Sequence, residues 1–418
     1  MGRLARCASL WAAAAVLGAQ APDGPDALLE RIQRKMAQNL NRLPDYVCLQ
    51  TVERSRRQSP AGSYQPLDTL RVEVGLVGNR ELYSWPDSSG FEDKELAEMI
   101  GRGVVGTGHF ALLAKHVFLS RVAEFTWKGE DLLNGRAAVR FDYQVPRNLS
   151  SYRIRVPPNE AVVGFHGSVW VAPDTLDLVR LEVRSNEIPE PLGMAEAVSI
   201  MDYARAPIGN SDFLLPQASE LRLVTLSGEE NRNRGEFTGC RQYRSESSLS
   251  FDEPSAQTGK PPGAPTLPPG SEIELSLDQE IDPEAAALGD SVRAVLARPL
   301  RQGQQVIAPE GAAVLGRVVR VEKQVLPFPH YIVALQFHTL DLGASQSRFL
   351  ATMEDAGPAP GLIRQKKRLD PTFTRRRSAR MDILVNEQQP GQGVIHWDAR
   401  QQRIRRGLKM RWRVDPGR

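Results

Sequence analysis

Residues 167–183 read Gly-Ser-Val-Trp-Val-Ala-Pro-Asp-Thr-Leu-Asp-Leu-Val-Arg-Leu-Glu-Val and contain two apolar runs on either side of a turn. The runs are rich in β-branched residues, which favour strands, and Pro173-Asp174-Thr175 is typical of a turn. Two strands joined by so short a turn must be antiparallel neighbours, because a parallel crossover needs about a dozen residues or more. The segment therefore predicts one hairpin of an antiparallel sheet.

The same pattern extends in both directions from this hairpin. Strand patterns dominate from residue 69 to residue 251, with tight turns such as Asn134-Gly135 between them. An amphipathic helix is predicted over 23–41, and two shorter helices over 92–100 and 107–118 interrupt the strands. These elements predict a twisted antiparallel meander with covering helices.

Length and composition indicate more than one globular domain. The chain has 418 residues, of which 41% are hydrophobic and 25% charged, and this argues against a collagen-like, coiled-coil or disordered chain. Such a length exceeds one ordinary core. Residues 252–270 hold six Pro and three Gly and are typical of a stiff linker. We therefore predict a first domain at 22–251 and a second at 271–418.

The second domain is also rich in strand patterns. Apolar and polar residues alternate over 272–277, and apolar and basic residues alternate over 408–414. No helical pattern is evident between them. The expected structure is a small β-sandwich or barrel, so the whole chain is predicted to be mainly β.

Residues 1–21 have the three parts of a secretory signal. Arg3 and Arg6 form a positively charged start, and an apolar run of 13 residues follows them. Ala19-Gln20-Ala21 then offers small residues at the cleavage positions. The run is shorter than the roughly 20 residues that a membrane-spanning helix needs, so a retained anchor is the lesser alternative. We expect cleavage after Ala21 and a periplasmic or secreted protein.

Two cysteines, Cys48 and Cys240, remain after this cleavage. An oxidising compartment favours a disulfide between an even pair. The alternative is two separate buried thiols.

The sequence contains no recognisable catalytic motif. It has no G-x-S-x-G nucleophile elbow. His109 and His116 are two helical turns apart, rather than the one turn that would bring both to a metal. We therefore predict a non-enzymatic protein with no catalytic residue, no metal site and no cofactor.

Aromatic side chains form the candidate ligand-binding site. Five of them fall on strands or adjoining turns of the first sheet: Trp85, Trp127, Tyr143, Phe165 and Trp170. If the sheet curves around a cavity, these rings line it for an apolar ligand. The alternative is that they form the core beneath the helices.

Together with the N-terminal helix and the long meander, residues 167–183 resemble the lipoprotein-carrier (LolA/LolB-like) superfamily. The resemblance covers roughly residues 23–251. It implies an incomplete barrel, here called a half-barrel, whose apolar interior holds acyl chains beneath helices. No functional residue of the carriers has a match in this sequence.

A second resemblance runs from Leu267-Pro-Pro-Gly-Ser-Glu-Ile-Glu-Leu through Gly289-Asp-Ser-Val-Arg-Ala to Val306-Ile-Ala-Pro-Glu-Gly-Ala-Ala-Val-Leu-Gly-Arg-Val. These segments are similar to the β-domain of TrbI-type conjugation scaffold proteins. The resemblance implies a periplasmic β-module used for protein contacts.

Charge is unevenly distributed along the chain. Residues 361–418 contain 16 Lys and Arg against 5 Asp and Glu, whereas the whole chain has 53 against 50. Export argues against nucleic acid as a partner, which leaves either no partner at all or, as we predict, a peripheral contact with anionic lipid headgroups or acidic envelope polymers. It falls on the predicted loop 364–380, with Lys366, Lys367, Arg368, Arg375, Arg376 and Arg377.

These observations predict an exported envelope protein that is not an enzyme. Its first domain binds a lipid, a lipoprotein or another apolar ligand, and its second domain binds an envelope protein. One alternative is a structural or assembly module without a ligand cavity. A weaker alternative is a hydrolase acting on envelope polymers, which requires converging carboxylates or a Ser/His pair in a cleft.

Overall fold

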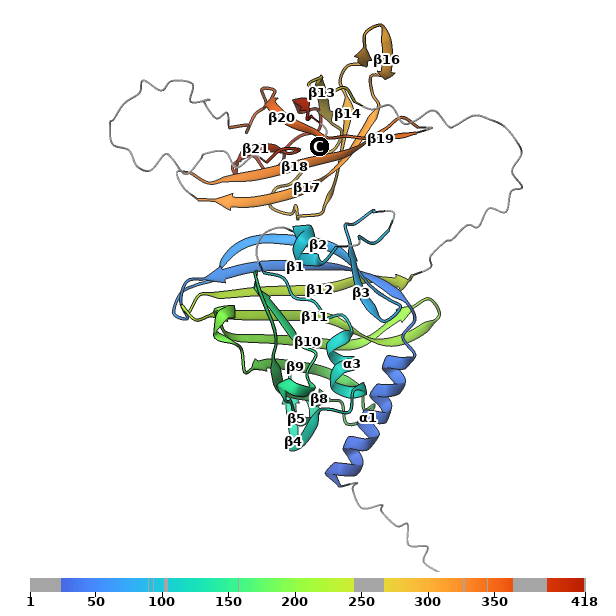
Figure 1. Cartoon of the computed structure of the whole chain (residues 1–418), viewed down its shortest axis with the longest axis vertical. Helices are drawn as coiled ribbons and strands as arrows, with labels where there is room; N and C mark the ends of the chain where they lie inside the picture. The colour runs from blue at the N-terminus through green and yellow to red at the C-terminus, as the bar shows by residue number, and fades with distance from the viewer. Residues whose placement is uncertain are drawn as a thin grey trace, which may run out of the picture.

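The computed structural model describes residues 24–88, 90–92, 94–100, 104–156, 158–243, 267–325, 328–343, 345–363 and 389–416. The predicted signal at 1–21 and the basic loop 364–380 lie outside the described residues, and so does most of the predicted linker. The basic side chains that fall outside are Lys366, Lys367, Arg368, Arg375, Arg376 and Arg377. The described chain is mainly β, which confirms the predicted fold class (Figure 1).

Ten antiparallel strands form the first sheet, in the order β3-β2-β1-β12-β11-β10-β9-β8-β5-β4. The hairpin predicted from residues 167–183 is β8 and β9, in which Val169 lies opposite Leu181. The strands are β1 (Tyr46–Arg57), β2 (Gln65–Val77), β3 (Arg80–Ser84), β4 (Glu124–Leu133), β5 (Arg136–Val145), β8 (Gly164–Val171), β9 (Leu178–Asn186), β10 (Met194–Ile208), β11 (Ser211–Thr225) and β12 (Glu230–Gln242).

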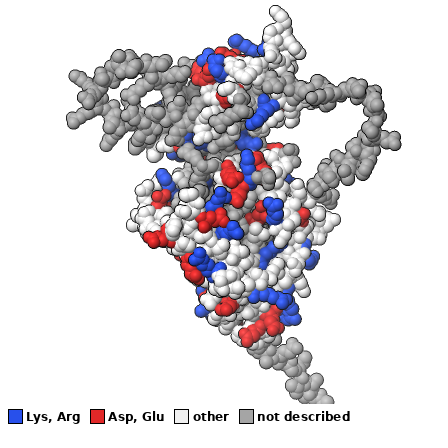
Figure 2. Space-filling model, viewed as in Figure 1, with Lys and Arg blue, Asp and Glu red and all other residues white. Residues whose placement is uncertain are grey.

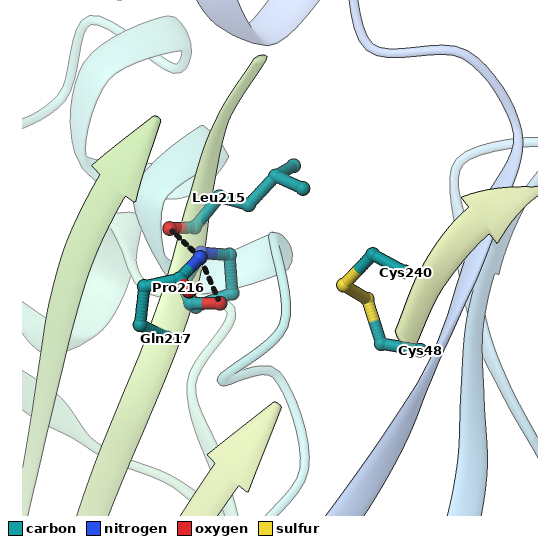
Figure 3. The surroundings of a disulfide bond; sticks show 5 residues. All are labelled: Cys48, Leu215, Pro216, Gln217 and Cys240. Carbon is teal, nitrogen blue, oxygen red and sulfur yellow. Dashed lines mark hydrogen bonds between the residues drawn. A yellow bond between two sulfur atoms is a disulfide. The ribbon is translucent and has the colours of Figure 1, made fainter. Parts of the chain in front are cut away.

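A disulfide connects β1 and β12, which are the first and last strands of this sheet along the chain and neighbours within the sheet. Cys48 on β1 is bonded to Cys240 on β12, 192 residues later, which confirms the predicted bridge (Figure 3). The bond lies beyond the part of β12 that pairs with its other neighbour, β11. Among the described residues, β11 pairs with β12 only from Ala218 to Val224. Figure 3 shows Leu215, Pro216 and Gln217 of β11 across this opening. The sheet therefore curls at this position into a half-barrel.

Three α-helices accompany the first sheet: α1 (Pro25–Asn41), α2 (Leu96–Ile100) and α3 (Leu112–Leu119). Pro25 stands at the start of α1, where its missing N–H costs nothing, and Ile32, Met36 and Leu40 form the buried face. The helix predicted over 107–118 begins only at residue 112, because Gly108 has a left-handed backbone with φ of +86°.

Smaller elements extend one end of the half-barrel. The 3₁₀ turns η1 (Arg147–Leu149) and η2 (Glu190–Leu192) flank a hairpin of β6 (Arg153–Val156) and β7 (Asn159–Val162). This hairpin covers a small apolar cluster that includes Ile154, Val163 and Met194.

The second sheet has eight strands. Its order is β19-β18-β17-β14-β13-β22-β20, with β21 also paired to β18. The last strand of the chain, β22, lies between β13 and β20, next to one end of this order. A short hairpin of β15 (Leu300–Gln302) and β16 (Gln305–Ala308) projects from it. The strands are β13 (Glu272–Leu277), β14 (Ser291–Leu296), β17 (Ala313–Gln324), β18 (His330–Asp341), β19 (Gln346–Arg348), β20 (Ala351–Ala356), β21 (Gly393–Asp398) and β22 (Lys409–Val414).

This second sheet closes almost into a barrel. The backbone N–H of Met353 on β20 donates to the carbonyl of Gln392, directly before β21, at 3.1 Å. The enclosed core contains four large aromatic side chains that are 2% exposed or less: Phe337, Phe349, Trp397 and Trp412. Their packing accounts for a separate hydrophobic core in this part of the chain.

The two sheets contact each other through β2 and the loop before β14. Leu288 forms a parallel bridge with Leu70 and is buried among side chains of the first sheet. The Arg71 guanidinium contacts the Asp290 carboxylate at 2.7 Å. Gly289 has φ of +98°, and a Cβ there would lie 2.2 Å from the carbonyl oxygen of Arg71. Only glycine therefore permits this close approach.

Candidate functional site

The concave face of the first sheet is apolar, and α1 and α3 cover it (Figure 1). Two clusters of buried side chains occupy this space, and half-buried Leu43 packs against both. We call the first the helix cluster; its large members include Ile32, Met36, Phe118, Phe141, Phe165 and Tyr203. We call the second the disulfide cluster; it includes Tyr46, Cys48, Val74, Tyr83, Phe110 and Phe237.

A glutamate on an edge strand fixes the beginning of α3. The Glu81 carboxylate on β3 accepts hydrogen bonds from the backbone N–H groups of Gly108 at 2.7 Å, Ala111 at 3.1 Å and Leu112 at 3.3 Å. Buried Tyr83 donates its hydroxyl to the same carboxylate at 3.0 Å. A carboxylate in this place satisfies free N–H groups at the start of a helix and complements the helix dipole. Glu81 therefore holds α3 on the rim of the sheet.

A second polar contact fixes the end of α1 on the opposite rim. Buried Asp177, which precedes β9, accepts from Asn39 on α1 at 3.3 Å. The guanidinium of Arg205 on β10 binds the same carboxylate with two hydrogen bonds, at 2.7 and 2.8 Å. Each covering helix is thus held by one carboxylate, by further polar contacts such as the one from Lys115 on α3 to Asn79 at 2.5 Å, and by apolar packing.

Side chains of the chain itself fill the space beneath the helices. Phe165 is fully buried there, and Phe118 of α3 packs in the same cluster. Two hollows formed by described residues lie elsewhere: one of ≈ 450 Å³ lined by Pro146, Arg147, Asn148, Val162 and Glu187, and one of ≈ 160 Å³ lined by Arg184, Val198, Ile200, Glu220 and Arg222. An apolar ligand therefore reaches the concave face only if the covering helices move.

Two tyrosine hydroxyls are buried in this interior without a hydrogen-bond partner. They belong to Tyr46, which is completely buried, and Tyr203, which is 8% exposed. Burial raises the pKa of both, and the Glu81 charge raises them further. Both phenols therefore stay protonated at neutral pH and are available as donors.

The five aromatic residues predicted to bind a ligand do not share one face. Trp127, Tyr143 and Phe165 lie together in the helix cluster, and the ring centroids of Tyr143 and Phe165 are 6.1 Å apart. Trp170 lies on the opposite face, where its indole N–H donates to Asp131 at 2.9 Å. Trp85 packs against the disulfide cluster and lies beneath the guanidinium of Arg317 on β17 of the second sheet. The structure thus brings three of the five together.

Two Ser/His pairs occur among the described residues. The Nε2 atom of His109 is 3.0 Å from the Ser199 hydroxyl, and the Nδ1 atom of His116 is 3.1 Å from that of Ser151. His109 and Ser199 are both buried, and burial lowers the pKa of His109 to about 4. Within the hydrogen bonds of the described chain, no carboxylate holds either imidazole as a hydrolytic triad requires. The pairs therefore lend no support to a hydrolase.

Metal-binding and membrane-spanning features are absent from the described residues. The described residues contain no group of three or more His, Cys, Asp or Glu side chains that could hold a metal ion. They also contain no helix that is both long and apolar enough to cross a membrane. On the face shown in Figure 2, acidic and basic side chains are interspersed over the first sheet. The predicted contact with an anionic surface therefore depends on the loop 364–380, outside the described residues.

Comparison with known proteins gives likenesses in structure alone. No family model and no curated protein matches this sequence. A LolA superfamily protein from Nitrosomonas europaea is 10% identical, with a TM-score of 0.27, and the match covers 51% of this chain and 93% of that one. A domain named as an outer membrane lipoprotein-sorting protein, from Vibrio parahaemolyticus, is 11% identical over 53% of this chain and 93% of its own, with a TM-score of 0.27.

A DUF1329 family protein from Desulfovibrio piger is similar to the same extent. It is 12% identical, with a TM-score of 0.28, over 56% of this chain and 98% of that one. All three likenesses cover about half of this chain. At such identities and TM-scores they assign no function to it. The TrbI-like character of the second domain stays a prediction.

Proposed function

We propose that this chain is a non-enzymatic extracytoplasmic protein that binds an apolar ligand on the concave face of the first sheet, beneath α1 and α3. One observation carries the proposal: an apolar concave surface is covered by two helices, and a carboxylate helps to hold each of them in place. Apolar surfaces with a few convergent polar groups are typical of small-molecule sites.

Binding would replace one set of apolar contacts by another. When α3 moves away from the sheet, Leu113, Val117 and Phe118 leave their partners in the helix cluster. An acyl chain that takes their place contributes about 0.8 kcal/mol for each buried CH₂ group. A long chain thus offsets the lost contacts, whereas a small polar molecule does not.

The disulfide supports a location outside the cytoplasm. Structural disulfides persist in oxidising compartments, and Cys48–Cys240 joins two strands of a core sheet. We further propose that residues 1–21 are the export signal and that the chain divides at 252–270. The loop 364–380 is proposed to touch an anionic surface after export.

The second domain is proposed to bind a protein partner. Its attachment supports this role, because Leu288 packs in the disulfide cluster and Asp290 pairs with Arg71 on β2. A change in the curl of the first sheet would therefore move the second sheet as well. Such a connection suits a protein that reports its ligand to a partner.

A second candidate function is a contact module that carries no ligand. The filled space beneath the helices favours it, since Phe118 and Phe165 already occupy the position of an acyl chain. In that case both sheets would serve protein contacts, and α1 and α3 would be permanent parts of the core.

Lipid analysis distinguishes these two functions. The protein would be purified from the envelope fraction without detergent, extracted with organic solvent and analysed by mass spectrometry, and the delipidated protein would be titrated with a fluorescent fatty acyl probe. We expect a co-purified acyl lipid and saturable binding of one probe per chain. Protein without lipid that also ignores the probe would refute ligand binding and favour the contact module.

A further inference from the structure

The buried hydroxyls of Tyr46 and Tyr203 belong to a small set of buried polar atoms without a hydrogen-bond partner among the described residues, which also includes His116 Nε2 and Asn186 Oδ1. Buried polar groups nearly always have a hydrogen-bond partner, because leaving one unpaired costs free energy. Among the residues that the structure describes, neither of these two hydroxyls has a partner. Tyr143, in the same interior, donates its hydroxyl to the Glu182 carbonyl at 2.8 Å. The unpaired state is therefore specific to these two positions among the three tyrosines.

Both hydroxyls lie where the two clusters beneath the covering helices meet. Tyr46, at the start of β1, belongs to the disulfide cluster and stacks on Phe110, with ring centroids 4.5 Å apart. Tyr203 belongs to the helix cluster and stands at a register shift of β10. Leu43, which follows α1, packs against both clusters. A ligand that enters beneath the helices would thus meet both tyrosines.

The charges around these phenols indicate what they would bind. The Glu81 carboxylate disfavours the anionic form of each phenol, and the two tyrosines also interact electrostatically. The phenols are consequently permanent donors, and the charge that acts on both of them is negative. A neutral acceptor suits this place, whereas a second negative charge would be repelled and would also lose its hydration on burial.

We propose that Tyr46 and Tyr203 donate hydrogen bonds to a neutral carbonyl oxygen of the ligand, the ester or amide group at the head of an acyl chain. This inference rests on the proposed function, because it assigns the polar end of the ligand that the concave face binds. The acyl chain would lie along the apolar side chains of the helix cluster, and the carbonyl would satisfy the two unpaired hydroxyls.

The test compares three probes of equal chain length on the delipidated full chain. They are cis-parinaric acid, its methyl ester and the corresponding conjugated hydrocarbon, titrated by fluorescence at pH 7. The variants are Tyr46→Phe, Tyr203→Phe and the double variant. The matched control is Tyr64→Phe, which loses a hydroxyl that is already paired with Glu230 and lies in neither cluster. We expect the wild type to bind the ester more tightly than the acid or the hydrocarbon.

Each Tyr→Phe change at the unpaired positions should weaken ester binding about 3- to 10-fold and leave hydrocarbon binding unchanged. The same changes should not lower the thermal unfolding midpoint without ligand, because they remove hydroxyls that bind nothing in the free protein. Equal ester affinity in the double variant and the wild type, or a preference of the wild type for the acid, would overturn the assignment. Failure of all three probes to bind wild-type protein would instead refute the proposed function itself.

Discussion

Replacing Glu81 by glutamine tests whether the carboxylate on β3 controls the movement of α3. Glutamine keeps the length of the side chain and one carbonyl oxygen but removes the negative charge. Three backbone N–H groups at the beginning of α3 would lose a charged acceptor, and so would the hydroxyl of Tyr83. The helix itself has only eight residues, so this contact is a large part of what orders its first turn.

The magnitude follows from these contacts. Loss of a helix-capping side chain costs about 0.5 to 2 kcal/mol, and a hydrogen bond to a charged group contributes about 1.5 to 3 kcal/mol. Glutamine still accepts through its neutral oxygen, so only part of this energy is lost. We expect the free energy of opening α3 to fall by about 1 to 3 kcal/mol, which raises the population of the open form about 5- to 150-fold.

Hydrogen exchange measures this opening directly. The backbone amides of α3 in the Glu81→Gln variant should lose protection by that factor, while those of β8 and β9 keep theirs. An acyl probe should also bind faster. Glu130→Gln, a change at an exposed position on edge strand β4, is the matched control. If α3 exchanges at the same rate in the wild type and in both variants, Glu81 does not hold the helix and the reasoning fails.

Two further predictions concern stability. Replacing Cys48 and Cys240 together by alanine should lower the free energy of unfolding by up to about 5 kcal/mol, since the bridge closes a loop of 192 residues. Guanidinium titration measures this loss, and an unchanged unfolding midpoint would contradict the prediction. Burial lowers the pKa of His109 from 6.5 to about 4, so the unfolded chain binds the extra proton and stability falls as the pH drops from 6.5 to 4. The loss approaches about 3 kcal/mol, and a His109→Gln variant should show a shallower decline in urea midpoints; identical pH profiles would argue against it.

Local patterns in the sequence predict the strands well because the relevant physics is local. The hairpin at 167–183 follows from β-branched runs around a turn, and the buried face of α1 follows from Ile32, Met36 and Leu40 at a spacing of four. The bridge between Cys48 and Cys240 follows from an even number of thiols after the predicted cleavage, in a chain that is predicted to be exported. None of these conclusions needs to know how the sheet curls.

The candidate site was predicted less well because it depends on the curl. Alternation along β8 does indicate that Phe165 and Trp170, an odd number of residues apart, face opposite sides of the sheet, so this part of the aromatic prediction could have been sharper. Glu81 could not be recognised, since its partners on α3 come together only when the edge strand bends over the helix. For Tyr46 and Tyr203 no local signal exists, because the lack of a partner is a property of the whole interior.

The position of β1 has a consequence for how the chain is made. β1 is the first strand of this sheet to be synthesised, and it pairs with β2 on one side and with β12 on the other. Its second edge must stay open while the ribosome adds the residues up to β12, and an open strand edge is a template for intermolecular pairing. Closing it requires a contact across 192 residues, which makes the first sheet slow to complete. A newly synthesised chain would therefore need protection from aggregation until its twelfth strand arrives.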